Sequence, residues 1–114
     1  MGELLEGGVN RGERRALRHY RLRGYRLIAA NVRAGGYELD LVVRRGRRLV
    51  VAEVKEKGGA GFGDPLEMVG TEKVRRVLVA AQAWLATRSD LAGLELVFEA
   101  VGVHGDRVER VPLI

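Results

Sequence analysis

Two stretches decide the fold: Tyr37-Glu38-Leu39-Asp40-Leu41-Val42-Val43 and, shortly after it, Leu49-Val50-Val51-Ala52-Glu53-Val54-Lys55. Both are rich in β-branched and aliphatic residues, which is typical of buried strands. Between them Gly46 suits the first central position of a type II′ turn, the kind that closes a β-hairpin. The pattern therefore predicts a hairpin with strands over 37–45 and 47–55.

The hairpin carries acidic residues where a buried strand would be apolar. With Gly46 and Arg47 as the two turn residues, Asp40 lies directly opposite Glu53 on one face, and Glu38 lies opposite Lys55. Carboxylates opposed in this way are about 4.5–5.5 Å apart at Cβ and repel each other. A Mg²⁺ ion beside a lysine would explain the set, and a salt-bridged strand pair at a sheet edge is the alternative.

The composition is that of one small soluble domain. The 114 residues can form one core but not two. No apolar run approaches the roughly 20 residues that span a bilayer. The N-terminus lacks the features of a signal peptide, and the chain has no cysteine. We expect a single domain over 1–114 with a flexible segment at 1–9, located in the cytoplasm and not at a membrane.

The chain is basic, with a net charge of +5 and a pI of about 10.2. Of its 20 basic residues, all except Lys55, Lys57 and Lys73 are arginines. Arginine pairs bidentately with phosphate, so the excess indicates nucleic acid as a partner. Genome composition or heat adaptation is the competing explanation.

The remaining elements follow from periodicity and from turn residues. They are a helix over 11–23 between Asn10 and Gly24, a strand over 25–34, a glycine-rich loop over 57–63, a helical turn over 66–69 after Pro65, a helix over 72–88 capped by Thr71, and strands over 94–104 and 107–112. The apolar stripe of the long helix is Val74, Val77, Leu78, Ala81 and Leu85. We expect Trp84 to pack in the core, and His19 and His104 to lie at the surface. The order αβββαββ predicts an α/β domain around one mixed sheet.

The first helix has an acidic residue on its apolar face and arginines on the other. Glu13 shares its face with Ala16, Leu17 and Tyr20. It could reach the Asp40–Glu53 site, or it could be a first-turn carboxylate that the helix dipole favours. The basic face can neutralise phosphates, or it can simply be solvated. Its members are Arg11, Arg14, Arg15 and Arg18, extended by Arg21, Arg23 and Arg26.

The long helix begins with cations, Lys73, Arg75 and Arg76, which oppose the positive end of the helix dipole. An anionic ligand such as a phosphate would explain this arrangement. A solvated surface is again the alternative.

These motifs resemble a known family. The spacing of Asp40, Glu53 and Lys55 resembles the core of PD-(D/E)xK nucleases, which have the restriction-endonuclease-like fold. Most of the chain, residues 11–103, resembles the YraN-like family of small bacterial proteins, which is similar to Holliday-junction resolvases. The matching segments are Gly12-Glu13-x-x-Ala16, Gly24-Tyr25, Asn31-x-Arg33, Glu38-Leu39-Asp40-Leu41, Glu53-Val54-Lys55, Phe62-Gly63-Asp64-Pro65-x-Glu67 and Lys73. Departures are Tyr37, Glu56-Lys57 and Phe98-Glu99.

The resemblance implies metal-dependent hydrolysis of nucleic acid, of DNA before RNA and with branched DNA as one substrate class. Glu13, Asp40 and Glu53 would hold one or two Mg²⁺ or Mn²⁺ ions, and Lys55 would be the catalytic lysine. A homodimer is implied only by analogy with resolvases. Two other functions stay open: a non-catalytic nucleic-acid-binding module with the nuclease fold, and a structural or partner-binding protein.

Overall fold

The computed structural model describes residues 9–56 and 70–114, and it has the expected element order. The elements are α2 (Arg11–Arg21), β1 (Arg26–Ala34), β2 (Tyr37–Arg45), β3 (Arg48–Glu56), α3 (Thr71–Leu85), a short 3₁₀ helix η2 (Ser89–Leu91), β4 (Glu95–His104) and β5 (Arg107–Pro112). The order αβββαββ is therefore confirmed. The loop over 57–63 and the helical turn over 66–69 lie outside the described residues.

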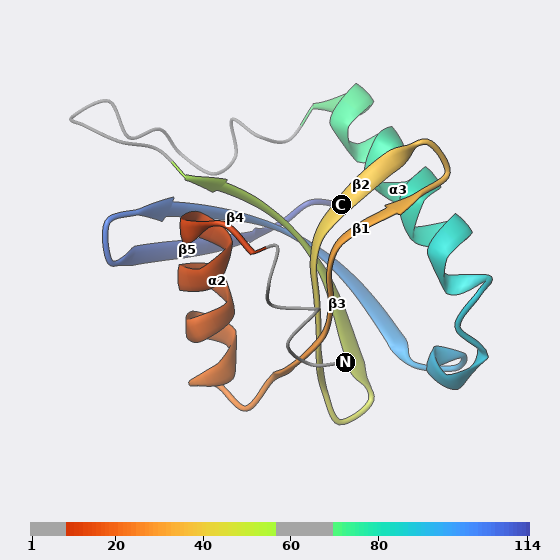
Figure 1. Cartoon of the computed structure of the whole chain (residues 1–114), viewed down its shortest axis with the longest axis horizontal. Coiled ribbons are helices and arrows are strands. Elements are labelled where there is room, and N and C mark those ends of the chain that lie inside the picture. The colour runs from red at the N-terminus through yellow and green to blue at the C-terminus, as the bar shows by residue number, and fades with distance from the viewer. Residues whose placement is uncertain (1–8, 57–69) are drawn as a thin grey trace.

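The five strands form one mixed sheet in the order β1-β2-β3-β4-β5. Neighbouring strands are antiparallel except β3 and β4, which are parallel and lie on either side of the α3 crossover in the chain. Helix α2 covers one face of the sheet and α3 the other (Figure 1). Within the described part of the chain, no helix has the length and apolar character needed to cross a membrane.

The hairpin turn has the predicted register. Gly46 has a φ of +60°, and Arg45 pairs with Arg48 on either side of the two turn residues. The ladder then runs to the pair Leu41 and Ala52. A two-residue turn determines which residues pair on either side of it, so the register could be derived from the sequence.

The ladder does not extend to the expected pairs of Asp40 with Glu53 and of Glu38 with Lys55, because it ends at Leu41 and Ala52. On the other edges of the two strands, Glu38 pairs with Arg33 of β1 and Lys55 pairs with Gly102 of β4. Figure 1 shows β2 and β3 diverging beyond the paired region, which opens a fork in the sheet.

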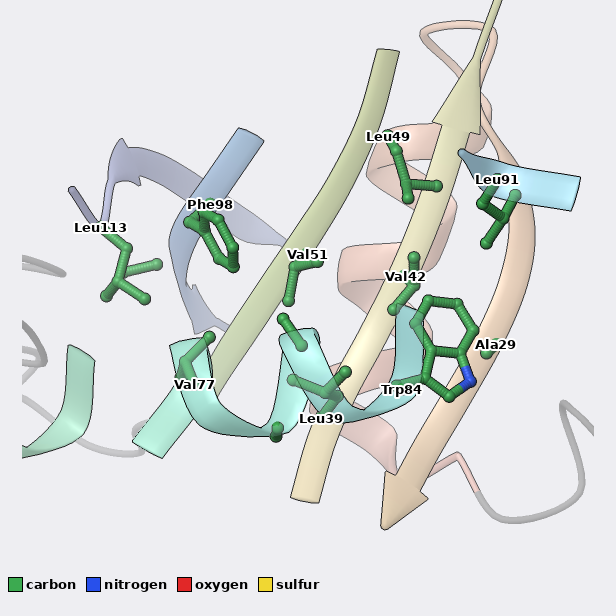
Figure 2. Close-up of a cluster of buried hydrophobic side chains, with 13 residues drawn as sticks. Ala29, Leu39, Val42, Leu49, Val51, Val77, Trp84, Leu91, Phe98 and Leu113 are labelled. Carbon is green, nitrogen blue, oxygen red and sulfur yellow. The ribbon is translucent and has the colours of Figure 1, made fainter. Parts of the chain in front are cut away.

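Two apolar layers hold the helices to the sheet. The layer under α3 includes Trp84, which packs as expected, and Figure 2 shows it with its neighbours between helix and strands. The buried residues of α3 are Val77, Ala80, Ala81 and Trp84. The expected stripe members Val74, Leu78 and Leu85 are only partly buried at the margin of this layer. The layer under α2 is Ala16, Leu17, Tyr20, Tyr25, Leu41, Val43, Val50, Ala52, Val101 and Val103.

The helix ends differ in part from the expectations. Asn10 does cap α2: its side chain accepts a 2.8 Å hydrogen bond from the Glu13 N–H. Thr71 does not cap α3, because Gly70 is the capping residue and Thr71 is the first residue of the helix. Helix α3 also ends at Leu85 instead of residue 88. His19 and His104 are half-buried and not fully at the surface.

Candidate active site

Asp40 and Glu53 lie at the fork, one on each of the diverging strands. The Asp40 Oδ2 accepts a 2.9 Å hydrogen bond from the backbone N–H of Val54. This bond links β2 to β3 where the backbone ladder has ended. Glu53 is buried, and its Oε2 has no hydrogen-bond partner among the residues that the structure describes. The fork therefore holds a desolvated carboxylate oxygen with unused capacity to bind a cation.

The local shape of β1 and β2 creates the site. Asn31 of β1 has a φ of +51°, and it falls between the ladder pairs Ala30–Leu41 and Val32–Leu39. A positive φ interrupts regular strand geometry. Residues two apart share a face in a regular strand, yet Leu39 packs in the α3 layer and Leu41 in the α2 layer. The β2 strand thus changes the facing of its side chains around Asp40.

The two carboxylates perturb one another. Burial, and then the charge of Glu53, raise the pKa of Asp40 to about 7, against a lowering by the Val54 hydrogen bond. Burial also raises the pKa of Glu53, although the nearby Lys73 ammonium opposes this. Perturbed acids that share a site are a feature of catalytic and metal-binding centres. The Asp40 carboxyl therefore titrates near neutral pH in the folded protein.

Glu13 comes near this pair, but it is engaged elsewhere. Its Oε1 accepts hydrogen bonds from the Asn10 backbone N–H at 3.2 Å and from Asn31 Nδ2 at 3.1 Å. Together with the Asn10 cap these contacts form a capping box at the start of α2. Its charge still contributes to the raised pKa of Asp40. Glu13 therefore caps the helix and adds negative charge behind the site.

The two lysines at the site differ in their surroundings. Lys73 of α3 places its Nζ 3.1 Å from the Glu53 Oε1. Lys55, on the same face of β3 as Glu53, is exposed and forms no ion pair with the described residues. The sequence motif links Lys55 to the acids, but in the structure Lys73 is the lysine that contacts Glu53.

The donor set fits a hard divalent cation bound through few protein ligands. No three acidic or histidine side chains form a metal-binding group among residues 9–56 and 70–114. Mg²⁺ commonly uses only one or two carboxylates, with waters and substrate phosphates completing its shell. Asp40 and Glu53 supply two carboxylates, and the unpartnered Glu53 Oε2 supplies a free ligand atom. Glu13 is not brought into a third ligand position.

Much of the predicted basic surface is neutralised within the chain. Arg11 and Arg15 both lie near Glu56, at 3.3 Å and 3.6 Å. Glu72 pairs with both Arg75 and Arg76, at 2.7 Å and 3.2 Å. Among the predicted contacts, Arg14 and Arg18 are exposed and form no ion pair with a described residue. These two arginines offer the least compensated charge of the set.

A basic groove of about 520 Å³ runs beside α2. It is lined by Arg15, Arg18 and His19 from the helix, by Leu22 and Arg23 after it, and by Asp106 and Val108 from the β4–β5 hairpin. Burial lowers the pKa of His19, and the charges of Arg23 and Arg110 lower it further, whereas that of Glu99 raises it. Three arginines against one aspartate give the lining a net positive charge, which suits a phosphate backbone.

Sequence reasoning missed several contacts that shape the site. The three departures from the family pattern all find partners: the Tyr37 hydroxyl lies 3.1 Å from Arg75, Glu56 pairs with arginines of α2, and Glu99 binds Arg110 at 2.9 Å. The Tyr20 hydroxyl also donates a 2.7 Å hydrogen bond to Glu99. The excess of arginine in the sequence was the one signal that could have predicted these contacts. Both acidic departures, Glu56 and Glu99, form ion pairs with an arginine from another element.

Comparison with known proteins gives one consistent result. The uncharacterised protein family UPF0102 matches residues 12–103. A UPF0102 protein of Acidothermus cellulolyticus is 46% identical over 107 residues, covering 90% of this chain and 75% of that protein. One from Pectobacterium carotovorum is 36% identical over 101 residues, covering 88% and 86%. One from Persephonella marina is 31% identical over 100 residues, covering 88% and 85%.

Proposed function

Because this chain belongs to the UPF0102 (YraN-like) family, with the acid and lysine motifs of that family at one fork of its sheet, we propose that it is a metal-dependent nuclease. The proposed reaction is hydrolysis of a phosphodiester bond in nucleic acid, with DNA as the first candidate and branched DNA as one substrate class. Asp40 and Glu53 would hold a Mg²⁺ or Mn²⁺ ion.

One observation carries the proposal. Two carboxylates of adjacent strands lie at a fork with one of their oxygens, Glu53 Oε2, buried and without a partner. Burying an unsatisfied carboxylate oxygen is costly unless the arrangement has a use. Burial and Glu53 raise the pKa of Asp40 to about 7, so the pair can give up a proton in exchange for a cation near neutral pH.

Each residue of the site has a separate role in the proposed reaction. A bound divalent cation would polarise the phosphate and lower the pKa of a water molecule. Asp40, held by Val54, and Glu53, held in the sheet, fix the place where the scissile phosphate lies. Lys55 is exposed on the same face, so its ammonium can stabilise charge that develops on the phosphate oxygens. Glu13 would contribute negative charge near Asp40 without binding the ion.

Arginines of α2 supply the proposed nucleic-acid contact. Arg14 and Arg18 project exposed cations from α2, and the groove beside that helix is lined by further basic residues. Such contacts go to phosphates and carry no base-specific information. The chain should therefore bind the backbone of nucleic acid and depend little on its sequence.

The second candidate is a nucleic-acid-binding module that keeps the fold but does not cleave. The ion pair between Lys73 and Glu53 favours it, because a lysine already neutralises one of the two carboxylates. On this alternative the buried acids would be structural.

Cleavage of a panel of labelled substrates separates the two candidates. The panel holds duplex, four-way-branched and single-stranded DNA and an RNA, each incubated with Mg²⁺, with Mn²⁺ or with a chelator. The nuclease proposal predicts products that depend on the cation and disappear with the chelator. Binding to the panel without any cation-dependent product would favour the binding module, and no binding at all would reject both.

A further inference from the structure

Lys73 occupies an unusual place on its helix. It lies in the first turn of α3, where the positive end of the helix dipole disfavours a cation. The anion that compensates belongs to the chain itself: the Glu53 Oε1 is 3.1 Å from the Lys73 Nζ. The neighbouring cations Arg75 and Arg76 are matched separately by Glu72. Lys73 is thus the cation of α3 that is directed at the acid pair.

The ion pair is asymmetric. The Glu53 side chain is 7% exposed, whereas the Lys73 side chain is 42% exposed. The carboxylate is therefore fixed inside the fork, while the lysine reaches it from the solvent side on a flexible stem. Lysine is a compact charge with rotatable donors and holds a carboxylate less rigidly than arginine does. The ammonium can leave without disturbing the core.

No other cation of the described residues forms an ion pair with Glu53. Lys73 is the partner of Glu53 in an ion pair, and the second carboxylate oxygen has no hydrogen bond. Lys55, on the same strand, is exposed and is not paired with Glu53. Without Lys73, the buried Glu53 and the half-buried Asp40 would have no ion-pair partner among residues 9–56 and 70–114.

We infer that Lys73 is the resident cation of this site: it neutralises Glu53 in the metal-free protein, and a divalent cation must displace its ammonium to bind. The inference rests on the proposed function for the position of the divalent cation. Lys73 is a positioning residue in this scheme, distinct from the catalytic Lys55. It stabilises the empty site at the expense of metal affinity.

The displaced ammonium has a second consequence. Lys73 would then be free at the same opening of the sheet, where a phosphate would lie. Cation binding and phosphate binding should therefore assist each other, and this coupling is reciprocal by thermodynamic necessity. Lys73 would thus weaken the binding of a divalent cation alone and weaken it less when a phosphate is bound at the same time.

The test is calorimetric titration of Mn²⁺ into wild type, Lys73→Met and Lys73→Arg at pH 8, paired with thermal unfolding without metal. Removing one positive charge next to the bound ion should tighten Mn²⁺ binding about tenfold or more. Lys73→Arg should bind Mn²⁺ no more tightly than wild type, because a guanidinium grips the carboxylate at least as firmly. Arg76→Met, which removes the same charge one turn away, should bind as wild type does.

The melting temperature of the metal-free protein is the second measurement. Lys73→Met should lower the melting temperature by roughly 5–10 °C, because it leaves the buried Glu53 without its ion-pair partner. Mn²⁺ should then raise the melting temperature of Lys73→Met more than that of wild type. If Lys73→Met is too unstable without metal, the comparison of Lys73→Arg with wild type carries the test alone. Tighter binding by Lys73→Arg, or equal or weaker binding by a folded Lys73→Met, would overturn the inference. If neither wild type nor Lys73→Met binds Mn²⁺, the metal site itself and the proposed nuclease function fail with it.

Discussion

Asp40 and Val54 join two strands that have stopped pairing. The Asp40 carboxylate accepts a 2.9 Å hydrogen bond from the Val54 backbone N–H, beyond the final β2–β3 ladder pair of Leu41 and Ala52. A side chain thus replaces the backbone carbonyl that would continue the ladder. This contact holds one acid at a fixed place beside Glu53, and the following expectations depend on it.

The stability of the metal-free protein should rise as the pH falls from 8 to about 5. Burial and Glu53 raise the pKa of Asp40 to about 7, from an ordinary value of 3.8. Above pH 7 the carboxylate is charged in both folded and unfolded states. Between the two pKa values the folded protein holds a proton that the unfolded chain has released, so protonation favours folding. The expected gain in the free energy of unfolding is on the order of 2–4 kcal/mol.

Urea denaturation of wild type and Asp40→Asn across that pH range checks this expectation. The amide oxygen of asparagine can still accept the Val54 hydrogen bond, and it carries no charge. Asp40→Asn should be more stable than wild type at pH 8 and should lose most of the rise toward pH 5. Parallel pH profiles for the two proteins would show that Asp40 has an ordinary pKa.

Lys55 should act in the chemistry more than in binding. It is exposed on the face of Glu53 and forms no ion pair with the described residues, so its charge is available to a phosphate. Lys55→Ala should reduce single-turnover cleavage about 10²–10³-fold. It should keep most of the nucleic-acid affinity measured in Ca²⁺, because several arginines remain. Lys55→Arg should recover only part of the rate, since a planar fork differs from a compact ammonium.

Near-normal cleavage by Lys55→Ala would remove that role. An equal loss of nucleic-acid affinity and of cleavage would instead indicate that Lys55 contacts the phosphate backbone of the nucleic acid.

Nucleic-acid binding should be electrostatic and sensitive to salt. The logarithm of the affinity should fall with the logarithm of the salt concentration, with a slope of about −0.9 per phosphate neutralised on duplex DNA. Arg14→Ala with Arg18→Ala should make the slope shallower by about 1–2, because these arginines form no ion pair with a described acid.

The matched control for that measurement is Arg44→Ala with Arg47→Ala. It removes the same charge from the β2–β3 hairpin turn, where neither arginine forms an ion pair with a described acid. A flat salt dependence of the wild type would exclude phosphate binding. An equal change of slope in both double variants would assign binding to net charge alone.

Gly12 should be essential to the seating of α2 on the sheet. A Cβ at this position would lie 2.8 Å from the Cβ of Glu56, which is closer than real contacts allow. Gly12→Ala should therefore push the first turn of α2 away from β3 and reduce the free energy of unfolding by about 1–3 kcal/mol. Gly70→Ala is the control, because nothing lies within 4 Å of the corresponding Cβ. Equal unfolding free energies for the two variants would contradict the close approach.

Local signals account for what the sequence could predict. The two turn residues Gly46 and Arg47 determine the register of the hairpin, and Asn10 followed by Glu13 predicts the start of α2. The family motif identified the acids and Lys55. These features depend on residues close in sequence, where geometry leaves few choices.

Tertiary effects account for the rest. The end of the β2–β3 ladder depends on how the strands twist around two different layers, and the positive φ of Asn31 has no clear signature in its neighbours. The contact of Lys73 with Glu53 depends on where α3 begins relative to the end of β3. Thr71 looked like a cap because threonine favours that position, but the helix begins one residue earlier than expected, at Thr71 itself, with Gly70 as its cap.

The most direct test of the account is Mn²⁺ binding by wild type and Asp40→Asn, measured by calorimetry at pH 8. The central claim is that the carboxylates of Asp40 and Glu53 together hold a divalent cation. At this pH Asp40 is largely ionised in the folded protein, since its pKa is about 7. The account predicts saturable heat in wild type and its loss in Asp40→Asn, whose fold is retained. Equal heats in the two proteins would contradict it.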